Sequence, residues 1–160
     1  MRSNFCGELN KTNLNEEVIL CGWVNRRRDH GGVIFLDLRD KKGLAQIVIN
    51  PETADTFKLA ETIRNEFVIK VTGKVLARDS EMINKKIPTG EIEVLANKIE
   101  ILNASKPIPF QLDSMETSEE VRLKYRYLDL RRDEMQQRLR LRSKVTHFMR
   151  DFMDKNDFLD

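Results

Sequence analysis

Cysteine and long apolar runs are the scarcest features of this sequence. Cys6 and Cys21 are the only cysteines in 160 residues, and neither they nor the two histidines have the spacing of metal ligands. No segment approaches the roughly 20 apolar residues that cross a bilayer, and the first residues contain no apolar run typical of a signal peptide. We therefore expect a cytoplasmic protein with reduced thiols, no metal site and no membrane contact.

A charge of one sign is also missing. The formal net charge is +2 although 34% of the residues are charged, and 40% are apolar, which is the composition of a folded globular protein. Binding to a polyanion would therefore depend on local clusters of basic residues, and a mixed-charge solvated surface is the alternative. The sequence also shows no nucleophile–base pair and no phosphate-binding glycine loop, so we expect no catalytic residue in it.

Alternating apolar residues predict five short strands in the first two thirds of the chain. They lie at residues 17–25, 33–38, 44–50, 67–76 and 91–101, with a turn over residues 26–32. A helix between the third and fourth strands is expected to begin with Asn50 as its cap and Pro51 at its first position, and to end near Asn65. This order predicts a mainly β fold, a five-stranded OB-fold Greek-key barrel, with a generic α+β meander as the alternative.

The hairpin loop at residues 40–43 predicts which side chains face outward. It pairs Arg39 with Leu44, so that apolar pairs such as Leu36 and Ile47 form the core face. Phe35 and Gln46 then share the outer face. OB folds stack unpaired bases on flat rings at this position, and a side-chain amide beside the ring can read a base edge. The alternative is that Phe35 packs under a loop.

Basic residues surround this outer face in the sequence. Arg26, Arg27 and Arg28 follow the first strand, and guanidinium groups bind phosphates and stack on bases. Further basic residues that could extend the surface are Arg39, Lys41, Lys42 and Arg78. Glu91 and Glu93 are also expected to point outward, where a carboxylate contributes base selectivity and no affinity for phosphate. A merely solvated charge run is the alternative.

The last third of the chain predicts a linker or hinge at residues 105–132 and one long basic, amphipathic helix from Asp133 onward. Thr117-Ser118-Glu119-Glu120 is typical of a helix start within the linker. The long helix gathers its apolar residues near one side, namely Met135, Leu139, Val145, Met149 and Phe152, with Leu141 and Phe148 flanking them. This apolar side requires a partner surface.

Four segments together resemble bacterial aspartyl-tRNA synthetases. They are Cys-Gly-Trp-Val-Asn-Arg-Arg-Arg-Asp (21–29), Phe-Leu-Asp-Leu-Arg-Asp (35–40), Thr-Gly-Glu-Ile-Glu-Val (89–94) and Tyr-Arg-Tyr-Leu-Asp-Leu-Arg (125–131). The last segment is shared by the aspartyl, asparaginyl and lysyl enzymes of class IIb. The resemblance implies that residues 1–104 form an anticodon-binding OB domain. It also implies that residues 133–160 are the helix at the start of a truncated class II catalytic domain.

The resemblance also implies roles for individual residues. Phe35 would stack on the middle anticodon base, a uridine, and Gln46 would hydrogen-bond that base. Positions around the other anticodon bases are Arg28, Arg78, Asn84 and Glu93, with Glu93 near the first base. The expected partner is tRNA(Asp), joined by tRNA(Asn) in relatives of relaxed specificity. His30 resembles the relaxed type, whereas Met82 departs from the glycine of that type.

The full-length relatives of the family imply more than this chain contains. They are homodimers that use ATP and Mg²⁺ to activate aspartate before it is esterified to tRNA. We expect no cofactor in the 160 residues. Three alternatives remain open: an asparaginyl or lysyl equivalent, a general single-strand-binding OB protein, and a pure interaction domain.

Overall fold

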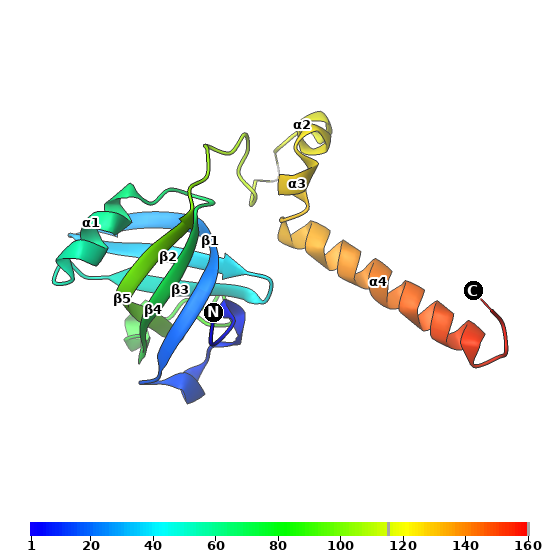
Figure 1. Ribbon diagram of the computed structural model, residues 1–160, viewed down its shortest axis with the longest axis horizontal. Helices are drawn as coiled ribbons and strands as arrows, with labels where there is room; N and C mark the ends of the chain where they lie inside the picture. The colour runs from blue at the N-terminus through cyan, green and yellow to red at the C-terminus, as the bar shows by residue number, and fades with distance from the viewer. Residues whose placement is uncertain (115, 160) are drawn as a thin grey trace. The chain divides into compact units, whose positions relative to one another are not determined.

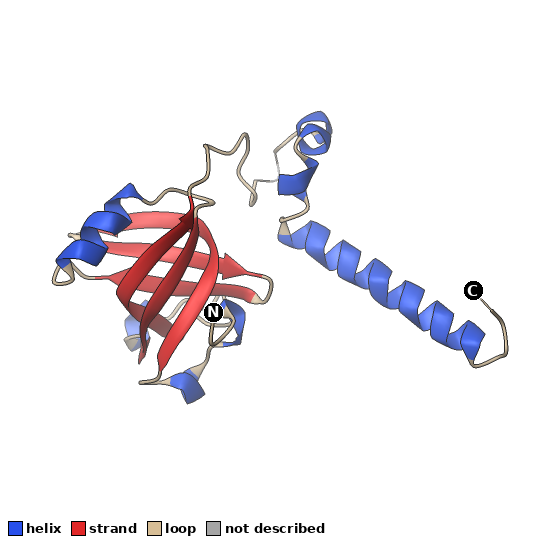
Figure 2. Cartoon of the chain, viewed as in Figure 1, coloured by secondary structure: helices blue, strands red, loops and turns tan. Residues whose placement is uncertain are grey.

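The structure is a computed structural model that describes residues 1–114 and 116–159. The chain divides into two compact units, Met1–Ile108 and Pro109–Asp160. The first, the barrel unit, is built mainly from strands, and the second, the helical unit, contains only helices and loops among its described residues (Figure 2). Nowhere in the described ranges is a helix both long enough and apolar enough to cross a membrane.

The barrel unit is a closed five-stranded barrel (Figure 1). Its strands are β1 (Glu17–His30), β2 (Val33–Asp40), β3 (Gly43–Ile49), β4 (Val68–Ala77) and β5 (Ile92–Asn103). They follow the order β1-β2-β3-β5-β4, and only the pair of β3 with β5 is parallel. Helix α1 (Ala54–Thr62) lies between β3 and β4 in the sequence. This arrangement confirms the predicted OB-fold barrel. Three 3-10 helices complete the unit: Cys6–Glu8, Lys11–Asn13 and Ser80–Met82.

The core follows from the register of the β2–β3 hairpin. Leu36 lies opposite Ile47, and Ile34 lies opposite Ile49, as the loop length predicted. These four side chains are fully buried in a cluster to which all five strands contribute. Because neighbouring residues in a strand point to opposite faces, the residues between them must lie outside the core.

Strand β1 is longer than predicted, and the turn expected over residues 26–32 is wrong for most of its length. Residues 26–30 continue the strand and pair with β2, ending at the pair His30 and Val33. Only Gly31 and Gly32 make the turn, with φ angles of 60° and 81°. Two consecutive positive φ angles define the tight hairpin turn that matches strand twist, and glycine adopts them without steric cost.

Helix α1 begins later than predicted. It starts at Ala54 because Asn50 forms a turn, in which the backbone N–H of Thr53 donates to the carbonyl of Asn50 at 3.2 Å. The expectation of an Asn50 cap and of Pro51 at the first helical position is therefore wrong, and the helix ends at Thr62. Ala60 and the following Ile63 are fully buried in the barrel core.

The helical unit contains α2 (Glu119–Lys124), α3 (Arg126–Asp129) and α4 (Asp133–Asp154). The hydroxyl of Ser118 accepts from the backbone N–H of Val121 at 3.5 Å, which confirms the predicted helix start. The carboxylate of Asp129 is buried and accepts from Arg126 Nη1 at 2.5 Å. This contact lies within residues 125–131, one of the four segments that carry the family resemblance. Helix α4 begins at Asp133, as predicted.

Candidate nucleic-acid interface

The outer surface of β1, β2 and β3 carries an aromatic ring beside polar side chains. Phe35 lies directly opposite Val48 on β3 and opposite Arg28 on β1, while Asp37 lies opposite Gln46. Directly opposite residues share a face of the sheet, so these side chains all lie on the outer surface. Phe35 is only partly covered. The structure thus brings Phe35 and Gln46 together as the register predicted.

Polar contacts connect the strands across this surface. One guanidinium nitrogen of Arg28, Nη2, donates to Asp37 Oδ1 at 2.5 Å and to Gln46 Oε1 at 3.4 Å. The other end of the Gln46 amide, Nε2, donates to Glu93 Oε2 at 3.2 Å. The chain of contacts Asp37–Arg28–Gln46–Glu93, here called the outer-face network, therefore spans β2, β1, β3 and β5.

Arg78 closes the network beyond the end of β4. Its Nε donates to the carbonyl of Ile92 at 3.0 Å and lies 3.8 Å from Glu93 Oε2. The side chain is only 4% exposed. Its Nη2, like the Nε of Arg28, has no hydrogen-bond partner among the described residues. Buried donors without partners are costly, so the outer-face network holds its two guanidinium groups at an energetic cost.

Burial also changes the acidity of this site. It raises the pKa of the Glu93 carboxyl above its ordinary value, against the opposing effects of the nearby Arg78 guanidinium and the Gln46 hydrogen bond. Burial likewise lowers the pKa of Arg78, although Glu93 and Asp37 counteract it. The outer-face network thus holds charges that are partly withdrawn from water.

Arg26 and Arg27 lie on opposite faces of β1. Arg26 is exposed and lies opposite Asp37, on the outer surface. Arg27 lies opposite the core residue Leu36, and its Nε donates to the carbonyl of Ala60 in α1 at 3.4 Å. The structure therefore separates Arg27 from the other predicted site residues, because a strand alternates its side chains between two faces.

Three other basic residues make contacts within the barrel unit. Arg39 Nη2 donates to both carboxylate oxygens of Glu66, at 2.8 and 3.0 Å, and the Glu66 side chain is only 3% exposed. Lys42 pairs with Glu8 at 2.9 Å, and the Lys41 ammonium lies 4.7 Å from the centre of the Phe5 ring. The expectation that these residues extend the binding surface is wrong for Arg39, which is committed to a buried ion pair.

The residues expected to set specificity lie in exposed positions. His30 is exposed at the end of β1, and Met82 is 71% exposed in the 3-10 helix after β4. Asn84 follows in the same loop, where its Oδ1 accepts from the backbone N–H of Lys86 at 3.0 Å. This contact holds the side chain in a local turn while leaving its amide nitrogen available.

A flat ring, an amide and two incompletely bonded guanidinium groups on an OB barrel suit an unpaired nucleotide. Residues 18–102 match the family model described as OB-fold nucleic acid binding domain. The chain belongs to this family. Residues 118–160 match a second family model, described as tRNA synthetases class II (D, K and N).

Individual relatives of this OB-fold domain agree with both matches. The chain is 67% identical over all 160 residues to the aspartate–tRNA(Asp/Asn) ligase of Ruthia magnifica subsp. Calyptogena magnifica, and it spans 27% of that protein. This similarity confirms the resemblance to aspartyl-tRNA synthetases. The asparaginyl-tRNA synthetase of Pyrococcus horikoshii, solved with asparaginyl-adenylate, superimposes with a TM-score of 0.83 at 26% identity, over 96% of this chain and 34% of that one. The fold also matches the aspartyl-tRNA synthetase of Entamoeba histolytica, with a TM-score of 0.87 at 22% identity, over 95% and 37% of the two chains.

Asp37 is the residue of the OB-fold site that the sequence reasoning left out of its candidates. The register already placed it on the outer face, opposite Gln46 and two positions from Phe35. Its ion pair with Arg28 depends on the register of β1 against β2, which no hairpin loop length predicts here.

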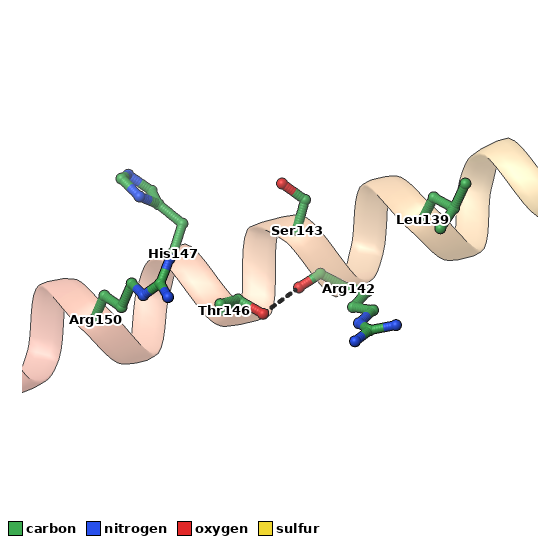
Figure 3. A pocket seen from close by; sticks show the side chains of 6 residues that line it. All are labelled: Leu139, Arg142, Ser143, Thr146, His147 and Arg150. Atoms are coloured by element: carbon green, nitrogen blue, oxygen red, sulfur yellow. Dashed lines mark hydrogen bonds between the residues drawn. The ribbon is translucent and has the colours of Figure 1, made fainter. Parts of the chain in front are cut away.

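A shallow hollow outside the OB-fold domain lies along one helix. Its lining residues all come from α4 (Figure 3): Leu139, Arg142, Ser143, Thr146, His147 and Arg150. The hydroxyl of Thr146 donates to the carbonyl of Arg142 at 3.0 Å, so it satisfies the helix backbone. The hollow is an open helix surface, and nothing in its arrangement indicates a catalytic group.

Proposed function

We propose that the barrel unit binds the anticodon loop of tRNA(Asp) on behalf of an aspartate–tRNA ligase. The observation that carries this proposal is the placement of Phe35 and Gln46 on one outer face of the barrel, in contact range of Arg28 and Glu93. Aromatic stacking supplies affinity for any base, whereas the amide supplies selectivity for one. The 67% identity to an aspartate–tRNA(Asp/Asn) ligase supports the choice of tRNA.

Each polar side chain then has a role in reading the loop. Phe35 stacks on the middle base, and Gln46 bonds its edge with one donor and one acceptor. Glu93 accepts from a base N–H at the first position. Arg28, Arg78 and Asn84 lie around the remaining bases, and the placement of Arg28 beside Gln46 and of Arg78 beside Glu93 supports this assignment. Arg26, which is exposed on the outer surface, contributes positive charge at the rim.

The full-length protein in this proposal activates aspartate with ATP and Mg²⁺, esterifies the tRNA, acts as a homodimer and resides in the cytoplasm. The match of residues 118–160 to class II synthetases supports it. Residues 1–104 are the anticodon-binding domain, 105–132 the linker or hinge, and 133–160 the start of the catalytic domain. Within the described residues no group of three His, Cys, Asp or Glu is placed to hold a metal ion.

Relaxed specificity for tRNA(Asn) is the second part of the proposal. The two anticodons differ in their third base, and the relative from Ruthia magnifica is named for both tRNAs. His30 resembles the relaxed type, and both His30 and Met82 are exposed. Replacing Met82 with glycine is expected to increase tolerance of the tRNA(Asn) third base. A titration with the two stem-loops measures it, and an unchanged ratio of the two affinities would remove Met82 from this role.

The central experiment is a titration of the full chain with the tRNA(Asp) anticodon stem-loop at low salt. We expect preference for uridine at the middle base, and Phe35→Ala should weaken binding by about 1–3 kcal/mol, since one stacked base contributes that much. Phe148→Ala is the matched control, because this phenylalanine is 71% exposed in α4 and outside the barrel unit. Its binding should equal that of the wild type.

Other results would select another function. Equal affinity for oligo-dT and the stem-loop would indicate a general single-strand-binding protein. Stronger binding of the asparagine or lysine stem-loop would indicate another class IIb enzyme. A complete lack of salt-dependent RNA binding would leave an interaction domain, because phosphate contacts always make affinity depend on salt.

A further inference from the structure

The orientation of the Gln46 amide is determined by its two neighbours. Arg28 can only donate hydrogen bonds, so the amide atom that faces it must be the oxygen. An ionised Glu93 can only accept, so the atom that faces it must be the nitrogen. Reversing the amide would place donor against donor and acceptor against acceptor in a side chain that is only 9% exposed.

This orientation leaves Gln46 with a defined pattern of free groups. The oxygen uses one of its two lone pairs for Arg28, and the nitrogen uses one of its two hydrogens for Glu93. One acceptor on the Arg28 side and one donor on the Glu93 side remain for a ligand. Uracil and cytosine differ in the order of donor and acceptor along their pairing edges. An amide that can reverse matches either base, whereas a fixed amide matches only one.

Asp37 controls the Arg28 end of this arrangement. The same Arg28 nitrogen that bonds Gln46 also bonds Asp37, at 2.5 Å. Asp37 lies directly opposite Gln46 in the register, and its side chain is only 22% exposed. Removing its charge would leave Arg28 without the carboxylate that anchors its guanidinium, so the group could leave the Gln46 oxygen.

We propose that Asp37 is a positioning residue for base selection: through Arg28 it fixes the Gln46 amide and so makes the site discriminate uridine from cytidine. The inference rests on the proposed anticodon-binding function and deepens it. Asp37 does not touch the base. Its effect is on the ratio of the affinities for the two pyrimidines, because it fixes the order of donor and acceptor.

The test compares Asp37→Asn with the wild type on stem-loops that carry uridine or cytidine at the middle position. We expect the dissociation constant for the cytidine loop, divided by that for the uridine loop, to fall by at least about fivefold. A correct set of paired hydrogen bonds discriminates bases by that much or more. The affinity for the uridine loop should fall by a smaller factor than the ratio of the two dissociation constants does. Asp37→Glu, which keeps the carboxylate, should restore part of the preference.

Asp29→Asn is the matched control. Asp29 is an acid on the same hairpin, but it lies opposite the core residue Ile34 and pairs with Arg27 at 3.6 Å, away from Gln46. The ratio of the dissociation constants of Asp29→Asn for the two loops should match that of the wild type. A folding defect in Asp37→Asn would weaken the binding of both loops equally. In that case Arg28→Gln tests the same contact between Arg28 and Gln46 by a different substitution.

Two results would contradict the inference in different ways. A folded Asp37→Asn variant with an unchanged ratio overturns the role of Asp37 and leaves anticodon binding intact. A wild-type chain that binds RNA without base preference overturns the proposed function and the inference with it.

Discussion

The barrel unit and the helical unit bury their apolar residues in opposite ways. Strand β2 places every second side chain in a closed core, and Ile34, Leu36 and Leu38 are fully buried. Helix α4, with 22 residues, buries none of its described side chains. Leu141 is 64% exposed and Phe148 is 71% exposed. The barrel unit contains the partners of its own apolar face, whereas the described residues of the helical unit provide no cover for the apolar face of α4.

The difference teaches where stability originates in each unit. In the barrel unit it comes from contacts between strands far apart in sequence, which bury apolar area. In α4 it must come from local terms, such as the ion pair between Arg138 and Glu134 one turn apart. Local terms of this kind contribute only tenths of a kcal/mol each. Substitutions in the two units should therefore differ strongly in their effects on unfolding.

The largest expected difference in the free energy of unfolding is between the alanine variants of two leucines. Leu36→Ala removes a fully buried side chain and should lower the free energy of unfolding of the barrel unit by about 3 kcal/mol, through lost burial and a residual cavity. Leu141→Ala removes an exposed side chain and should change the free energy of unfolding by less than about 0.5 kcal/mol. Urea denaturation followed by circular dichroism and by Trp23 fluorescence measures both. A comparable loss in Leu141→Ala would show that α4 is covered in solution, for example in a dimer.

A second comparison tests ion pairs within the barrel unit. Glu66→Gln leaves Arg39 without its carboxylate partner in a mostly buried position and should cost about 3 kcal/mol. Glu91→Gln breaks the pair with Lys11, whose two side chains are 59% and 51% exposed, and should cost less than about 1 kcal/mol. Denaturation of both variants at the same pH and salt decides the matter. Equal effects would mean that the hydrogen bond that Arg39 Nη1 already donates to Asn25 Oδ1, at 2.6 Å, is sufficient to hold the buried guanidinium.

The sequence alone predicted the β2–β3 surface because two simple rules were sufficient. A four-residue loop set the register, and the alternation of Ile34, Leu36 and Leu38 with other residues set the face. Those rules placed Phe35 and Gln46 together. Nothing else on the chain had to be known, because both strands belong to one hairpin.

The β1 side of the site could not be predicted in the same way. Three consecutive arginines carry no visible alternation, so the sequence predicts a turn there. In the structure the strand continues, with Arg26 and Arg28 facing outward and Arg27 facing α1. The register also shifts at a bulge between Val24 and Arg26, which reverses the faces. The contact of Gln46 with Glu93 joins residues that are 47 positions apart and depends on the parallel pairing of β3 with β5, which no local pattern encodes.

The smallest expected effect is a dependence of stability on pH at the outer-face network. Because burial raises the pKa of Glu93, the folded state holds its proton more tightly than the unfolded state, whose value is about 4.3. The resulting stabilisation is complete below that value and is lost as the pH rises through the folded pKa. Glu93→Gln removes the charge, so the variant should be more stable than the wild type at neutral pH, and the difference should disappear below about pH 4.

Glu100→Gln is the control with the opposite sign. The hydrogen bond and charge of Lys70 lower the pKa of Glu100, so its contribution is present above the unfolded value and is lost as the pH falls. This variant should be slightly less stable than the wild type at neutral pH. Urea midpoints between pH 4 and pH 8 for both variants provide the comparison. A Glu93→Gln variant that is less stable at neutral pH would mean that the contacts with Arg78 and Gln46 outweigh burial. Greater stability of Glu93→Gln would mean that the barrel unit keeps a destabilising carboxylate on its outer face. Packing of the core gives no reason to keep this carboxylate, whereas base recognition gives one.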